Sequence, residues 1–211
     1  MGSVSDEGRE YEERLEAAKE AWEAEIVARE LEQRTTDNAR YFMMNSLQQY
    51  GPAISRCVGQ ARSLFEAGFF GPSLVWSATV LEMIIRFVLV GPLLESIIPG
   101  EEIAELITRE MTRSGSRKFK ELFPHILEHW DVQTGDLCVD DGRKLVPCMK
   151  EAFDARNAAV HEGAPVSESE AELGLLCLAA IFPVIKSLGE RVGCGGIQSW
   201  PEGWDSGHSD G

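Results

Sequence analysis

The sequence is short of positive charge. It has 20 Lys and Arg residues against 35 Asp and Glu residues, which gives a formal net charge of −15 at pH 7 over 211 residues. Proteins that hold nucleic acids by the backbone usually carry a cationic surface that releases phosphate counterions. The composition therefore excludes a general grip on nucleic acid, and any such role has to use a local patch.

The patterns of a secreted, membrane-anchored or disulfide-bonded protein are also missing. The first residues turn acidic at Asp6 without a basic and apolar leader. The most apolar stretch, 74–90, contains Glu82 and Arg86, so it predicts a buried helix in which these two charges pair rather than a transmembrane span. The five cysteines form an odd set with no C-x-x-C pair, which favours buried free thiols in a reducing cytosol. We expect a cytoplasmic protein that makes no membrane contact.

Alternation with period two is absent, whereas apolar residues recur at helical spacing, which predicts an all-α fold. Helices are expected at 6–34, 53–68, 73–90, 101–112, 117–130, in a segment that ends near 156–161, and at 168–191. Ser167 and Glu170 match a capping box at the start of the last of these. Three Gly-Pro pairs, at 51–52, 71–72 and 91–92, are expected to separate the earlier helices.

The composition divides the chain into three parts. Residues 1–50 predict an acidic helical arm, whose apolar seam suits packing on its own domain or on a second copy. The seam consists of Tyr11, Leu15, Ala18 and Trp22. Residues 51–192 predict a helical domain, and the Gly-rich residues 193–211 predict a flexible tail. Trp200 and Trp204 in this tail are expected to dock on a partner, to stack on a base, or to have no role.

The most informative stretch is Phe153-Asp-Ala-Arg-Asn-Ala-Ala-Val-His-Glu-Gly163. On a helix, its apolar face consists of Leu145, Met149, Phe153 and Val160, and its polar margin of Lys150, Asp154, Asn157 and His161. Arg156 falls near the middle of the apolar face, where a guanidinium needs a carboxylate, a phosphate or a cleft. Since His moves protons near neutral pH and Arg stabilises negative charge on phosphate oxygens, the pair has the chemistry that RNA phosphodiester cleavage needs.

These residues resemble a known family. Arg156-Asn157-x-x-x-His161 at a helix end, followed by Gly163 and a capped final helix, is similar to the motif of the HEPN superfamily (higher eukaryotes and prokaryotes nucleotide-binding). The segment Leu81-Glu82-Met83-Ile84-Ile85-Arg86 also resembles the apolar helix with an internal Glu that packs against the motif helix in that family. The resemblance covers roughly residues 53–190. It implies an all-α HEPN-like bundle that forms a homodimer, with the motif helices of two protomers facing each other across one cleft.

The resemblance further implies a metal-independent endoribonuclease without a cofactor, in which the RNA 2′-hydroxyl attacks the adjacent phosphate and leaves a cyclic phosphate end. His161 would act as general base or acid, Arg156 would steady the scissile phosphate, and Asn157 would orient it, with Glu82 and Asp154 in support. Such enzymes often serve as prokaryotic toxins or phage-defence effectors, with a regulatory protein partner. Gly163 stands where one subgroup has a Tyr, so regulation through that Tyr is not expected here.

Other interpretations remain open at this point. Arg156 would hold the bundle together by pairing with Glu82 or Asp154, and His161 would be a helix C-terminal residue favoured by the helix dipole. The protein would then be a catalytically inactive helical module that binds nucleotide, RNA or a protein partner. His125-Ile-Leu-Glu-His129 matches a zinc-protease pattern, but such sites need a third ligand and usually a larger fold.

A basic cluster is the best candidate for an RNA-facing patch in this acidic chain. It consists of Arg109, Arg113, Arg117, Lys118 and Lys120, with Lys150 closer to the motif. Cations clustered in this way can bind phosphates along an RNA strand. An ordinary solvated helix face explains the same residues equally well.

Overall fold

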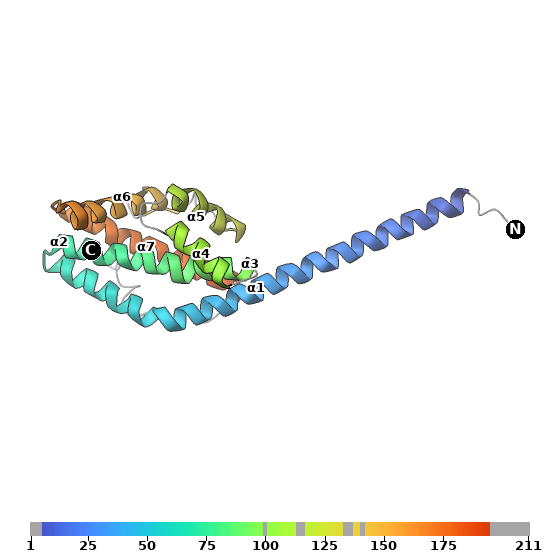
Figure 1. Cartoon of the computed structure of the whole chain (residues 1–211), viewed down its shortest axis with the longest axis horizontal. Coiled ribbons are helices and arrows are strands. Elements are labelled where there is room, and N and C mark those ends of the chain that lie inside the picture. Colours follow the sequence, from blue (N-terminus) through green and yellow to red (C-terminus); the bar gives the residue numbers. More distant parts are fainter. Residues whose placement is uncertain (1–5, 99–100, 113–116, 133–136, 140–141, 195–211) are drawn as a thin grey trace.

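The computed structural model describes residues 6–98, 101–112, 117–132, 137–139 and 142–194. Its regular elements within these ranges are all helical, apart from one isolated β-bridge between Cys138 and Lys144. The predicted all-α class is therefore confirmed. A bundle of helices forms the body of the molecule, and the N-terminal half of the first helix extends beyond it (Figure 1).

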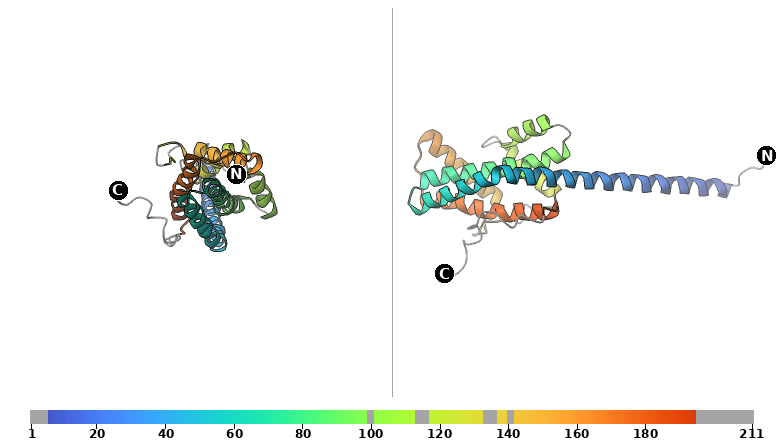
Figure 2. Two further views of the ribbon diagram at one scale, coloured as in Figure 1. Left: turned by 90° about the vertical axis from the view of Figure 1, so that its left-hand side faces the viewer. Right: turned by 90° about the horizontal axis from the view of Figure 1, so that it is seen from below.

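The first helix, α1, runs without a break from Asp6 to Glu66. At 1.5 Å per residue it is about 90 Å long, and its N-terminal part projects well clear of the bundle in the right-hand view of Figure 2. The prediction that Gly51-Pro52 separates two helices is wrong, because Pro52 lies inside α1. Proline removes one backbone hydrogen bond and crowds the carbonyl four residues earlier, and the helix axis bends in this region (Figure 1). The expected boundary between residues 50 and 51 thus lies within a helix.

The first part of the arm, as far as Trp22, does not pack on the bundle where its side chains are described. Ala18 is exposed, and the indole of Trp22 is 62% exposed. The side chains of Tyr11 and Leu15 lie outside the described set. Later in the same arm, Ala39 and Met43 are fully or almost fully buried, so this part packs on its own domain as expected, although not through the predicted seam.

The second long helix runs from Phe70 to Ile97 and consists of α2 (Phe70–Met83), a π-helical stretch η1 (Ile84–Val90) and α3 (Gly91–Ile97). Gly71-Pro72 lies in its first turn, and Gly91-Pro92 does not end it, contrary to the sequence-based prediction. Pro92 has no N–H to donate to the carbonyl four residues back. Instead, the Gly91 N–H donates to the Arg86 carbonyl five residues back, which is the wider π pattern.

The remaining helices complete the bundle. They are α4 (Glu101–Thr112), α5 (Arg117–His129), α6 (Leu145–Asn157), a π-helical turn η3 (Ala158–Glu162) and α7 (Glu168–Arg191). The helix α2 packs against both α1 and α7, and α6 lies on α7. The predicted capping box is confirmed: the Ser167 N–H donates to Glu170 Oε2 at 2.7 Å, and the Glu170 N–H donates to Ser167 Oγ at 3.3 Å.

Two of these helices are apolar and long enough to span a membrane. They are 70–97 and 168–191, each with a mean hydropathy of 1.8 over its most apolar window. In this structure, 61% and 50% of these windows is buried inside the bundle. Their apolar residues supply most of the core, including Leu81, Ile85 and Ile181.

All five cysteines are free thiols. The prediction of buried thiols is confirmed for Cys148, Cys177 and Cys194, whereas Cys57 is half-buried and Cys138 is exposed. Burial raises the pKa of the Cys194 thiol, and the nearby positive charge of Arg40 partly offsets this effect. The residues from 195 onward, including Trp200 and Trp204, lie outside the described part of the chain.

Candidate functional site

The motif helix α6 is held against the core by its apolar face. Leu145, Met149 and Phe153 are buried, as the helical spacing predicts. Val160 was expected on the same face, but its side chain is 53% exposed. The reason is that α6 ends at Asn157, and the wider η3 turn shifts the later side chains around the helix axis.

Arg156 forms an ion pair with Glu82 of α2, a residue 74 positions earlier in the chain. The side chain of Arg156 is 15% exposed and that of Glu82 is 33% exposed, so the pair is largely removed from water. A buried guanidinium requires such a partner. The expected pairing of Glu82 with Arg86 is wrong, because Glu82 points to Arg156 and the Arg86 guanidinium lies over the Phe87 ring, 5.1 Å from its centroid.

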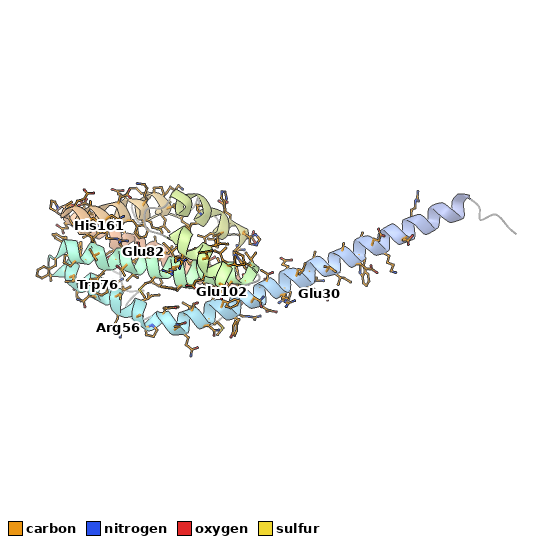
Figure 3. All side chains as sticks on the ribbon, in the orientation of Figure 1. Glu30, Arg56, Trp76, Glu82, Glu102 and His161 are labelled. Carbon is orange, nitrogen blue, oxygen red and sulfur yellow. The ribbon has the colours of Figure 1, made fainter. Side chains whose placement is uncertain are left out.

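His161 lies in the η3 turn at the end of the bundle that is opposite to the arm (Figure 3). It is exposed and makes no hydrogen bond or ion pair with any other described residue. In an α-helix, residues five apart point about 140° away from each other. Since hydrogen bonds in a π turn join residues five apart, the turn brings positions 156 and 161 closer to one side of the helix than an α-helix would.

The polar atoms around Arg156 are incompletely satisfied. Arg156 Nε and Asn157 Oδ1 are buried, and neither has a hydrogen-bond partner among the described residues. Asp154, the other expected supporting residue, pairs with Lys150 one turn earlier on the exposed side of α6. Asp154 is therefore not the partner of Arg156, and Lys150 is ion-paired rather than free.

An apolar groove of about 500 Å³ adjoins the motif. Its walls come from the start of α2, including Pro72 and Trp76, and from the chain around η3, including Val160 and Val166. Trp76 and the nearby Phe69 are also exposed. The groove places an apolar surface beside the η3 turn, which also carries His161.

Comparisons with protein-family models, with curated proteins and with solved structures found no match to this chain.

Of the RNA-binding candidates, Lys150 lies on the motif helix α6, and Arg109 does not lie near the motif. Arg109 is exposed near the end of α4. Arg117, Lys118 and Lys120 belong to α5, but their side chains lie outside the described set, as does the whole of Arg113. The helices α4 and α5 lie along the bundle toward the arm, whereas His161 lies at the opposite end (Figures 1 and 3).

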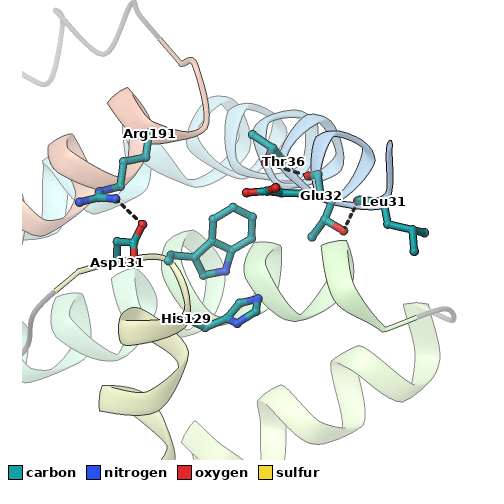
Figure 4. Close-up of a pocket in the computed structure, with 8 residues that line it drawn as sticks. Leu31, Glu32, Thr36, His129, Asp131 and Arg191 are labelled. Carbon is teal, nitrogen blue, oxygen red and sulfur yellow. Dashed lines mark hydrogen bonds and ion pairs between the residues drawn. The ribbon is translucent and has the colours of Figure 1, made fainter. Parts of the chain in front are cut away.

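The His-x-x-Glu-His pattern lies at the end of α5. His125 is 75% exposed, and its Nδ1 is 3.4 Å from the Glu128 carboxylate. No group of three or more His, Cys, Asp or Glu side chains that could hold a metal is found among the described residues. His129 points instead toward a pocket of about 550 Å³ between α1 and the ends of α5 and α7 (Figure 4).

The Figure 4 pocket also contains an ion pair, because Arg191 donates to Asp131 at 3.0 Å. Asp131 adopts a left-handed backbone conformation, with φ of 56°. Neither this pocket nor the two π-helical stretches were anticipated from the sequence. The Gly-Pro pair at 91–92 was the available signal for the first π stretch, since it forces a local rearrangement in a continuing helix.

Proposed function

We propose that this protein is a metal-independent endoribonuclease of the HEPN type. In this proposal, His161 acts as general base or acid on the RNA 2′-hydroxyl or the leaving oxygen. Arg156 supplies positive charge close to the scissile phosphate, and Asn157 helps to position it. No metal or cofactor takes part.

The observation that carries the proposal is the state of His161. It is exposed, it has no partner among the described residues, and the η3 turn holds it beside the helix end that bears Arg156 and Asn157. A general base has to be reachable by substrate and cannot be tied up in a structural hydrogen bond. The exposed and unpartnered imidazole satisfies both requirements.

The apolar groove beside the η3 turn supports the dimeric part of the proposal. Exposed Trp76 and Val160 would become buried if the same face of a second copy packed there. A twofold axis at this face would bring the two η3 turns together, so that two Arg-His sets share one cleft.

A second candidate function has a specific observation in its favour. The Arg156 guanidinium is already paired with Glu82 and is only 15% exposed. This arrangement suits a structural Arg in a catalytically inactive helical module that binds nucleotide, RNA or a protein partner. The two candidates predict different results for the same substitutions.

The decisive experiment compares RNA cleavage by the wild type, His161→Ala and His125→Ala in the presence of EDTA. His125 is a matched control because it is an exposed His on another helix. General acid-base catalysis is typically worth about 100-fold or more, so His161→Ala should lose most of the cleavage and His125→Ala should keep it. Products should end in a 2′,3′-cyclic phosphate. Cleavage that survives in His161→Ala, or absence of cleavage by the wild type, would contradict the proposal.

Light scattering on the full chain tests the shared cleft. We expect a particle of twice the 23.3 kDa chain mass at micromolar concentration. Val160→Asp should shift this particle toward the monomer, because it places a charge in the proposed interface. A wild-type monomer that still cleaves RNA would remove the dimer from the mechanism.

A further inference from the structure

A pocket of about 590 Å³ lies on a different part of the bundle, where α1 faces η1, α3 and α4. It is lined by Tyr41, Asn45 and Gln49 from α1, Arg86 from η1, Glu95 from α3 and Glu105 from α4. None of these residues belongs to the Arg156–His161 motif. The volume is large enough for one nucleoside-sized ligand.

Aromatic rings form part of the pocket wall. Tyr50 of α1 stacks on Phe87 of η1, with ring centroids 4.3 Å apart and an interplanar angle of 15°. Tyr41 lines the pocket as well, and this residue is 63% exposed. An exposed aromatic ring at a pocket provides a face on which a flat, aromatic ligand can stack.

The η1 stretch places Arg86 in this pocket. Arg86 and Phe87 are neighbours in η1, and both line the pocket. The Arg86 guanidinium forms no ion pair with any described carboxylate, although two carboxylates line the same pocket. A half-buried and unpaired guanidinium has N–H donors available in a fork that matches two adjacent acceptors.

The pocket also offers acceptors and amides. Glu105 is exposed and pairs with no other described side chain. Asn45 and Gln49 lie one turn apart on α1, and the described residues contain no hydrogen-bond partner for either amide. The lining therefore combines a flat aromatic surface, a forked donor and a charged acceptor.

We propose that this pocket binds a guanine base. Guanine presents two adjacent acceptors, O6 and N7, which a guanidinium binds with two parallel hydrogen bonds. Its opposite edge presents the N1–H and the 2-amino group as donors, which a carboxylate such as that of Glu105 accepts. Tyr41 supplies the stacking surface, and the amides of Asn45 and Gln49 complete the polar contacts at the rim.

The same chemistry disfavours the other bases. Adenine carries an amino group in place of O6 and an unprotonated N1, so it opposes a donor to Arg86 and an acceptor to Glu105. The pyrimidines lack the N7 acceptor and offer less area for stacking. The guanine can come from a free nucleoside or from an RNA strand, and the proposal does not depend on catalysis by His161.

Calorimetric titration of the full chain tests the proposal and separates the two sources. One arm uses guanosine and adenosine, which are uncharged and so avoid repulsion by the acidic protein. The other arm uses 2′-deoxy pentamers of thymine with one central guanine or adenine, which cannot be cleaved by 2′-hydroxyl attack. We expect a Kd below about 1 mM for at least one guanine probe and binding about 10-fold or more weaker for its adenine counterpart.

Substitutions locate the site. Glu105→Gln should weaken guanine binding about 10-fold, the effect of one good base contact, because it replaces a charged acceptor with an amide. Glu102→Gln is the matched control, being an exposed Glu one turn earlier on α4 that does not line the pocket. Arg86→Lys should also reduce the preference for guanine, because it keeps the charge but loses the fork.

The outcomes are decisive in both directions. If the protein binds guanosine, the ligand is a free nucleoside. If it binds only the pentamer that contains guanine, the ligand is a strand. Either result supports the proposal. Equal affinity for guanine and adenine, no binding of any probe at millimolar concentration, or guanine binding unaffected by Glu105→Gln overturns it. Because the deoxy probes are not substrates, the result is independent of the RNA cleavage assay.

Discussion

Replacing Glu82 by Gln tests what holds Arg156 in place. The substitution keeps the size of the side chain and removes the charge that pairs with the guanidinium. Breaking a fully buried pair from one side costs about 3–5 kcal/mol. Since the Glu82 side chain is a third exposed, water recovers part of that loss, and we expect the free energy of unfolding to fall by about 2 kcal/mol.

The measurement is urea unfolding followed by circular dichroism at neutral pH. If the same variant is unfolded by heat, a loss of about 2 kcal/mol in a chain of this size corresponds to a decrease in Tm of about 4–8 °C. Asp154→Asn is the matched control, because it makes the same chemical change in the more exposed Lys150–Asp154 pair of the same helix. An exposed pair is worth less than about 1 kcal/mol, so the control should unfold almost like the wild type.

A double-mutant cycle completes the test. Arg156→Gln, alone and combined with Glu82→Gln, should give a coupling energy of about 1–2 kcal/mol, since the two side chains contact each other directly. A coupling near zero, or a Glu82→Gln cost no larger than that of Asp154→Asn, would refute the reasoning. Loss of RNA cleavage in an Arg156→Gln protein that stays folded would assign Arg156 a role beyond this ion pair.

Two further predictions concern stability. In Gly174→Ala the new Cβ would lie 3.0 Å from Ser77 Cβ. In Gly59→Ala, the control, the new Cβ meets no atom within 4 Å, and the helix gains propensity. We therefore expect Gly174→Ala to be about 2 kcal/mol less stable than Gly59→Ala in urea unfolding, and equal stabilities would contradict this close helix contact. Ser167→Ala should cost about 1 kcal/mol at pH 7. The hydrogen bonds from Ser167 lower the pKa of Glu170. The stability lost in Ser167→Ala through these bonds is therefore present above the usual Glu pKa and disappears as the pH falls through the lowered pKa of Glu170. A stability loss that does not change with pH would contradict this role of Glu170.

The sequence by itself determined the elements whose signals are local. Helical spacing predicted the all-α class and the extents of α4, α5 and α7, and the capping box predicted where α7 begins. Local signals succeed here because propensity, capping and apolar spacing act between residues within one or two turns. The same spacing placed Arg156 on an apolar face. Because a guanidinium there is shielded from water, the sequence alone predicted that Arg156 needs an acidic partner or a ligand.

Only the tertiary structure decided which partner that is. Asp154 and Glu82 were equally available to sequence reasoning, and Glu82 was expected to pair with Arg86 as readily as with Arg156. The packing of α6 beside α2 brings Glu82 into contact with Arg156, 74 residues later in the chain. Asp154 pairs with Lys150 instead. The Arg86 guanidinium, which has lost Glu82 as a partner, lies over the Phe87 ring at the pocket.

The Gly-Pro pairs also show the difference between a local sequence signal and the outcome that tertiary packing decides. Each is a local signal for a helix end, yet at Pro52 and at Gly91-Pro92 the helix continues. Burial of long apolar faces outweighs one lost hydrogen bond, since a proline in a helix costs about 3 kcal/mol and each fully buried aliphatic side chain contributes about 1.5–3 kcal/mol. The π stretch at 84–90, which precedes Gly91-Pro92, contains Arg86, and a separate π turn at 158–162 contains His161. The sequence thus determined which residue types are available at the Arg156–His161 motif and at the Arg86 pocket, and the packing of the bundle determined their geometry.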